Sequence, residues 1–152
     1  MSHENVEIAR RCIEGIARAF EAYWEDPRPL APAMETGDVP PEAKEIFRYL
    51  DSEIEWNSAF AGVSFHGHLD CARGWDWLLE AVEHYALTLE EVTDLGDDQV
   101  LAVMDRALTG KDSGIEVTAP LFSVITLRDG LIIRNDEYSD RTEALQAAGQ
   151  PE

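Results

Sequence analysis

Apolar side chains recur at steps of three and four positions over residues 6–24, which predicts an amphipathic helix with one buried face. This helix is expected to end at Asp26, because the residue before a proline is pushed out of helical geometry. Five of the seven prolines fall within residues 27–41, so we expect an irregular surface insertion there, either a plain excursion or a lid. A short helix from Pro41, a short strand over 52–57, a glycine-punctuated loop over 58–67 and a third helix over about 70–85 are expected to follow.

The period of the apolar pattern changes after Tyr85. Four β-branched and aliphatic runs (86–95, 99–109, 115–127 and 131–139) are separated by breaks short enough for hairpins, which predicts an antiparallel meander. Pro120 cannot donate to a strand ladder, so an edge or a bulge is expected there. Asp140 is expected to cap a last helix that Gly149 ends. Helices followed by a long sheet predict an α+β layer fold with a cavity between the layers.

Composition narrows the range of partners. The chain has 152 residues, which predicts a single domain over 1–152 that carries the proline-rich insertion. Its formal net charge of -19 disfavours nucleic acid and anionic membrane surfaces. No apolar run reaches the length of a membrane span, the polar start does not resemble a signal peptide, and Cys12 and Cys71 suit a reducing compartment. The sequence therefore predicts a cytoplasmic protein.

Five short stretches together resemble the SnoaL-like proteins of the nuclear transport factor 2-like superfamily. This resemblance implies an α+β fold in which a cone-shaped, curved, antiparallel or mixed sheet wraps over N-terminal helices. It also implies a pocket inside the cone and a homodimer formed through the outer face of the sheet. The stretches are Glu4-Asn5-Val6-Glu7, Ile54-Glu55-Trp56, Phe65-His66-Gly67-His68, Thr126-Leu127-Arg128-Asp129-Gly130 and residues 138–145 (YSDRTEAL).

The superfamily includes ketosteroid isomerases, polyketide cyclases, dehydratases, epoxide hydrolases and non-catalytic binding modules, so the fold alone fixes no function. A ketosteroid isomerase needs a tyrosine, a carboxylate base and a neutral carboxylic acid. The resemblance aligns Ile13, Trp56 and Ser123 with those three positions, and none of the three can do the required chemistry. An isomerase of that type is not expected.

The resemblance to SnoaL-type cyclases implies a pocket in which one carboxylate on the last strand acts as both acid and base. The register counted from Gly130 turns Asn135 and Glu137 toward the cavity and Asp136 away from it. Burial would raise the pKa of Glu137 and suit it to proton transfer near neutral pH. The alternative is a structural carboxylate bonded to a neighbouring hydroxyl or arginine, and Arg106 is a candidate for that partner.

Other polar and aromatic residues complete the predicted site. His68 and Asn135 are the expected polar helpers of Glu137. No metal site is expected, because His66 and His68 could share a metal only in a sharply bent backbone and Asp70 is the sole further ligand nearby. The predicted ligand-binding residues are Ile13, Trp56, Phe60, Phe65 and Ser123.

No cofactor is expected, because the chain has neither a glycine-rich dinucleotide fingerprint nor a phosphate-binding loop. The sequence thus leaves two function classes open. One is a cofactor-independent cyclase- or isomerase-type enzyme that acts on a small apolar or mixed-polarity organic molecule, and the other is a non-catalytic ligand-binding or dimerisation module. The homodimer prediction rests on strand positions expected to face outward, namely Val103 or Leu101, Val124 and Ile133.

Overall fold

The computed structural model describes residues 2–59 and 62–150. Helix α1 (Ser2–Glu25) ends directly before Asp26-Pro27, as the sequence predicts. Its buried face packs on a core that also includes residues from five strands. Ala9, Cys12 and Ile13 lie at the centre of this face.

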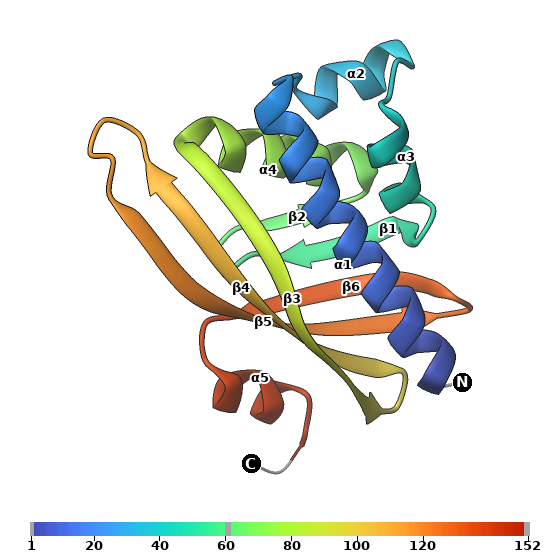
Figure 1. Cartoon of the computed structure of the whole chain (residues 1–152). Coiled ribbons are helices and arrows are strands. Elements are labelled where there is room, and N and C mark those ends of the chain that lie inside the picture. Colours follow the sequence, from blue (N-terminus) through green and yellow to red (C-terminus); the bar gives the residue numbers. More distant parts are fainter. Residues whose placement is uncertain (1, 60–61, 151–152) are drawn as a thin grey trace.

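A curved, open sheet of six strands forms the second layer (Figure 1). The strands are β1 (Leu50–Asn57), β2 (Ser64–His66), β3 (Val82–Gly96), β4 (Gln99–Gly110), β5 (Glu116–Arg128) and β6 (Leu131–Tyr138). Their order in the sheet is β2-β1-β6-β5-β4-β3. Among the strand pairs of the described residues, β1–β6 alone is parallel, so the predicted α+β fold with a mixed sheet is confirmed.

Helices cover both faces of the sheet. Helix α1 crosses one face, and α2 (Leu30–Thr36), α3 (Pro41–Phe47) and α4 (His68–Ala81) gather at one end of the molecule (Figure 1). Helix α5 (Arg141–Ala147) lies at the other end, and the Asp140 side chain caps it through the backbone N–H of Thr142. None of the helices in the described part of the chain is long and apolar enough to cross a bilayer.

The outer face of the sheet is less open than the sequence predicted. Leu101 and Val124, two of the expected outward apolar positions, are nearly inaccessible because they pack with Ala144 of α5. They are therefore not free to hold a partner subunit. Val103 is partly buried against the same cluster.

Residues 27–41 are only partly irregular, which corrects the prediction of a structureless insertion. They contain α2, whose first turn is held by a residue distant in sequence. Both carboxylate oxygens of Asp76 in α4 accept backbone hydrogen bonds, from Leu30 N at 2.6 Å and from Ala31 N at 2.8 Å. Because this cap comes from another helix, the local sequence does not show it.

The predicted third helix was too long at its C-terminal end. Helix α4 ends at Ala81, and Val82 and Tyr85 already belong to β3, where they pair with Gly110 and Leu108. The predicted loop over 58–67 also contains β2, which is held by pairing with β1. In both places, pairing with a strand distant in the sequence decides the local structure.

Pro120 lies where β5 is paired on one side only, which agrees with the predicted edge position. It lies opposite Asp105 of β4, whereas the pairing of β5 with β6 begins only at Phe122. The side of β5 that would need an N–H from residue 120 therefore faces no strand.

Candidate functional site

An inner cavity of about 90 Å³ lies between α1, α4 and the sheet. Most of its wall is apolar, supplied by residues such as Ile16, Phe20, Trp75 and Met104. Polar groups converge on it from the strands, namely Tyr85, Arg106, Ser123, Asn135 and Glu137. A mainly apolar cavity with a few convergent polar groups is the usual form of a small-molecule site.

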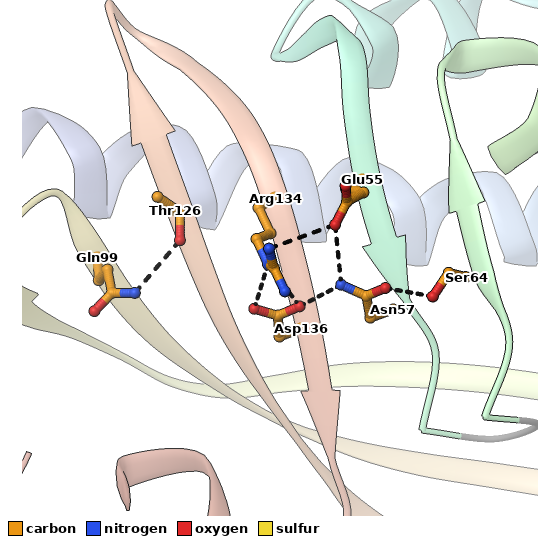
Figure 2. A network of polar contacts seen from close by, with 7 residues as sticks. All are labelled: Glu55, Asn57, Ser64, Gln99, Thr126, Arg134 and Asp136. Carbon is orange, nitrogen blue, oxygen red and sulfur yellow. Dashed lines mark hydrogen bonds and ion pairs between the residues drawn. The ribbon is translucent and has the colours of Figure 1, made fainter. Parts of the chain in front are cut away.

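Strand register places the two polar residues of β6. Ile125 pairs with Asn135 and Ser123 pairs with Glu137, and all four side chains line the cavity. Because side chains alternate across a strand, the intervening Asp136 points to the opposite face. Figure 2 shows that face, with α1 behind the sheet, and Asp136 there accepts hydrogen bonds from Arg134 at 2.8 Å.

Glu137 lies in surroundings that disfavour its charged form. Burial raises the pKa of Glu137 above its usual value. Neighbouring groups oppose part of this rise in pKa, in decreasing order the Trp56 indole, the backbone N–H of Ala59, the Arg106 guanidinium and the Ser58 hydroxyl. The Ala59 N–H donates to the carboxylate at 3.3 Å. Glu137 keeps some accessible surface because it borders the cavity.

Arg106 does not neutralise Glu137 by direct contact. The ion pairs within residues 2–59 and 62–150 do not include these two side chains, and one guanidinium nitrogen of Arg106, Nη2, donates instead to Pro120 O at 3.3 Å. The alternative prediction is therefore wrong in its arginine form, in which Arg106 pairs with Glu137 and lowers its pKa. Its hydroxyl form has support, because the Ser58 hydroxyl opposes part of the rise in the pKa of Glu137. Arg106 nevertheless lines the same cavity, and its charge opposes part of the rise in the pKa of Glu137.

Three buried polar atoms at the cavity lack a hydrogen-bond partner within the described residues. They are Trp56 Nε1, Arg106 Nε and Asn135 Oδ1. The Trp56 indole lies close enough to Glu137 to lower the pKa of that carboxylate, yet its N–H makes no hydrogen bond of ordinary geometry. Burying such a group unpaired costs about 1–3 kcal/mol. Two donors and one acceptor are thus left to meet a ligand.

Tyr85 is the main residue of the site that the sequence reasoning placed elsewhere. Its ring packs edge-on against Phe20 at 5.3 Å between centroids. Burial raises the pKa of its hydroxyl, which the Arg106 charge lowers in part. The alternation of apolar residues after Tyr85 could have been followed back to it, because Tyr85 and Leu87 both line the cavity.

Two cysteines also line the cavity, from α1 and α4. Burial raises the pKa of the Cys12 thiol to about 12 and has the same effect, again to about 12, on the pKa of Cys71. A thiol that stays protonated is a poor nucleophile. These residues therefore act as apolar wall.

Five predicted site residues come together at this cavity: Ile13, Trp56, Ser123, Asn135 and Glu137. Phe65 and His68 are not among the described residues that line it. Phe65 instead packs against Trp56, with ring centroids 4.8 Å apart. Phe60 lies outside the described residues.

His68 holds the backbone rather than facing the cavity. Its Nε2 lies 2.9 Å from Leu50 O, and its ring packs on Phe47 with centroids 4.9 Å apart. Its place as the first residue of α4 directs the side chain toward β1 and α3, which local sequence could not reveal. In the described part of the chain, no group of three His, Cys, Asp or Glu residues is arranged to hold a metal ion.

Comparison with known proteins identifies the family. Residues 28–135 match the SnoaL-like domain family, so the chain belongs to that family. Comparison with curated protein sequences gives no match.

Solved structures agree with the fold. A nuclear transport factor 2-like protein of unknown function from Burkholderia pseudomallei K96243 is 14% identical, with 94% of this chain and 95% of that chain covered and a TM-score of 0.63. TerC, co-crystallised with polyporic acid, is 16% identical, with 94% and 98% covered and a TM-score of 0.61. A protein from Jannaschia sp. CCS1 provisionally named a SnoaL-like polyketide cyclase is 18% identical, with 94% of each chain covered and a TM-score of 0.56.

Proposed function

We propose that this protein is a cofactor-independent enzyme of the cyclase or isomerase type, which moves a proton on a small organic molecule bound in the inner cavity. The observation that carries the proposal is the carboxylate of Glu137, which borders an apolar cavity with its pKa raised by burial. A carboxylate with a raised pKa is a stronger base when ionised and remains available as an acid nearer neutral pH. Both properties are needed to take a proton and return it.

The proposed step is proton transfer at a carbon next to a carbonyl group. Glu137 takes the proton from that carbon, and the electron pair of the broken C–H bond moves onto the carbonyl oxygen to give an enolate. Glu137 then returns the proton at another position of the enolate. In the cyclase route the enolate carbon instead attacks a second carbonyl of the same molecule, whose π electrons move to its oxygen, and Glu137 gives the proton to the alkoxide that forms. Neither route requires an oxidant or a reductant.

The unpaired donors of the cavity fit this chemistry. Trp56 Nε1 and Arg106 Nε are buried without partners, and donors held in a low-dielectric site stabilise a developing oxyanion strongly. Asn135 Oδ1 is an unpaired acceptor that suits a hydroxyl of the same ligand. The co-crystal of TerC with polyporic acid and the provisional name of the Jannaschia protein support a small organic molecule as the ligand.

Deuterium exchange tests the proposal directly. Hydroxymethyl ethyl ketone carries a carbonyl, a hydroxyl and exchangeable C–H bonds, and NMR in heavy water follows the loss of its C–H signals. The wild-type protein is expected to accelerate exchange, and Glu137→Gln to slow the catalysed rate by at least about 100-fold. Glu55→Gln is the matched control, because Glu55 lies on the outer face of the sheet (Figure 2). Its Oε2 is 3.5 Å from Nη1 of Arg134.

The competing function is a non-catalytic ligand-binding module. It is favoured by Ile13, Trp56 and Ser123, which stand where the isomerase resemblance requires a tyrosine, a base and an acid. A module would bind the ketone with an affinity within a few-fold in wild type and Glu137→Gln, and would leave the exchange rate at its value in buffer. That result would refute the enzyme.

A further inference from the structure

A second hollow of about 300 Å³, here named the outer chamber, lies among α1, α2, α3 and α4. Its inner walls are mainly apolar and include Ala19, Ala22, Tyr23, Ala43 and Leu79. Part of its wall comes from the proline-rich insertion through Leu30, whose backbone N–H is bound by Asp76. The outer chamber is therefore built by the insertion together with the helices beneath it.

The outer chamber adjoins the inner cavity. Ile16, Phe20 and Trp75 line both spaces, so these three side chains form the wall between them. Ile16 and Trp75 are only partly buried although they lie between packed helices. Trp75 also contacts Trp56 of the inner cavity, with ring centroids 5.8 Å apart. At these positions the two spaces are thus separated by side chains, which can change rotamer.

Size and charge indicate what such a molecule would be. An apolar cavity of roughly 150 Å³ holds benzene, so an inner cavity of about 90 Å³ has room for a small head group and not for a long tail. The lining of the outer chamber includes four acidic residues, Glu25, Asp26, Glu42 and Asp76, against one arginine, Arg28, and the chain carries a formal charge of -19. An anionic ligand would be repelled on approach. A neutral molecule with an apolar tail would not.

We propose that the outer chamber is a second subsite for the same ligand, which is a neutral hydroxylated carbonyl compound with an extended apolar tail. The head lies in the inner cavity against the unpaired groups of Trp56, Arg106 and Asn135, and the tail passes between Ile16 and Trp75 into the outer chamber. This inference rests on the proposed function for the head, and it adds the length and polarity of the substrate class.

A chain-length series tests the subsite. Calorimetry or NMR titration measures the Kd of hydroxymethyl ketones with alkyl groups from ethyl to octyl. Each added methylene that leaves water is expected to tighten binding about threefold to fourfold. If the tail enters the outer chamber, the gain continues to the longest member, and the methyl signals of Ala19, Ala22 and Ala43 shift on binding.

Filling the outer chamber supplies the matched comparison. Ala19 lines the outer chamber and not the inner cavity, so the larger side chain of Ala19→Trp fills the outer chamber alone. Ala22→Trp has the same effect and replaces the first variant if that one folds poorly. Either variant is expected to bind the ethyl ketone as the wild type does and to lose the gain from longer chains. Glu14→Trp, at an exposed position of the same helix, is expected to keep the full series.

The outcomes separate the two proposals. Binding that stops improving after the shortest ketones, with unshifted alanine methyls, would overturn the outer subsite and leave the function of the inner cavity standing. An undiminished length effect in both tryptophan variants would also overturn it. Absence of binding by every ketone would refute both.

Discussion

Gly74 allows α4 to approach the aromatic pair that supports the site. A Cβ built at this position would lie 2.8 Å from Phe65 Cζ and 2.8 Å from Trp56 Cζ3. These distances are well inside van der Waals contact, so a methyl group requires one of the rings to move. Gly74→Ala is therefore a sharp test of the packing beside Glu137.

Two opposing effects decide the magnitude. Alanine is favoured over glycine in a helix interior by about 1 kcal/mol. Overpacking a filled core costs about 1–3 kcal/mol. Trp56 is only 7% exposed and is held between Phe65 and Trp75, so the indole has little room to yield. We expect the clash to win and the free energy of unfolding to fall by about 1 kcal/mol, and by no more than about 2.

Urea unfolding followed by circular dichroism measures this change. Gly15→Ala in α1 is the matched control, because a Cβ there would lie 3.4 Å from Ile46 Cγ1, which is ordinary contact. Gly15→Ala should leave stability unchanged or raise it by up to about 1 kcal/mol through helix propensity. If Gly74→Ala were as stabilising as Gly15→Ala, the packing argument for Trp56 would be refuted.

Three further predictions concern charge, capping and assembly. Because folding raises the pKa of Glu137, the folded chain still holds a proton at a pH where the unfolded chain has released it. The free energy of unfolding should therefore fall as pH rises past about 4.3, the pKa in the unfolded chain, and level off above the pKa in the folded chain. The total fall is about 1.4 kcal/mol for each unit by which folding raises the pKa. Glu137→Gln should lack this fall in paired urea titrations, and an identical fall in the variant would contradict it. Asp76→Ala should lose about 1–2 kcal/mol and speed hydrogen exchange of the Leu30 and Ala31 amides, whereas unchanged exchange would exclude Asp76 as their cap. The homodimer implied by the family resemblance stays a prediction: sedimentation near neutral pH in moderate salt should give twice 17.0 kDa, and a concentration-independent monomer would contradict it.

Much of the sheet could be predicted because its signals are local. The turn at Asp129-Gly130 begins the β5–β6 pairing, and the predicted inward Glu137 and outward Asp136 are both found. The register shifts between Thr126 and Leu127, however, so the turn alone does not decide which face these two residues occupy. Pro120 marked the unpaired side of β5 for a similar reason, since the missing N–H is a property of the residue itself.

The errors occur where distant contacts decide the structure. Tyr85 has the apolar spacing of the preceding helix, but pairing with Leu108 draws it into β3. His68 stands beside a strand that lines the cavity, but its hydrogen bond to Leu50 turns it away. The cap on α2 comes from Asp76, which lies more than one element away along the chain. No window of sequence contains both partners of these contacts.

The two adjacent carboxylates of β6 indicate which polar groups serve the fold and which serve a ligand. Asp136 on the outer face is paired with Arg134 at 2.8 Å within a polar network, so folding itself recovers the cost of burying it (Figure 2). Glu137, one residue later, has its charged form disfavoured by burial, and unpaired donors of Trp56 and Arg106 line the same cavity. Folding recovers only part of the cost of burial at Trp56 Nε1, whose N–H favours the Glu137 carboxylate from poor geometry, and a ligand that pairs with an unpaired donor would recover up to about 1–3 kcal/mol. Unpaired polar atoms gathered at a single cavity are therefore better explained by binding than by stability.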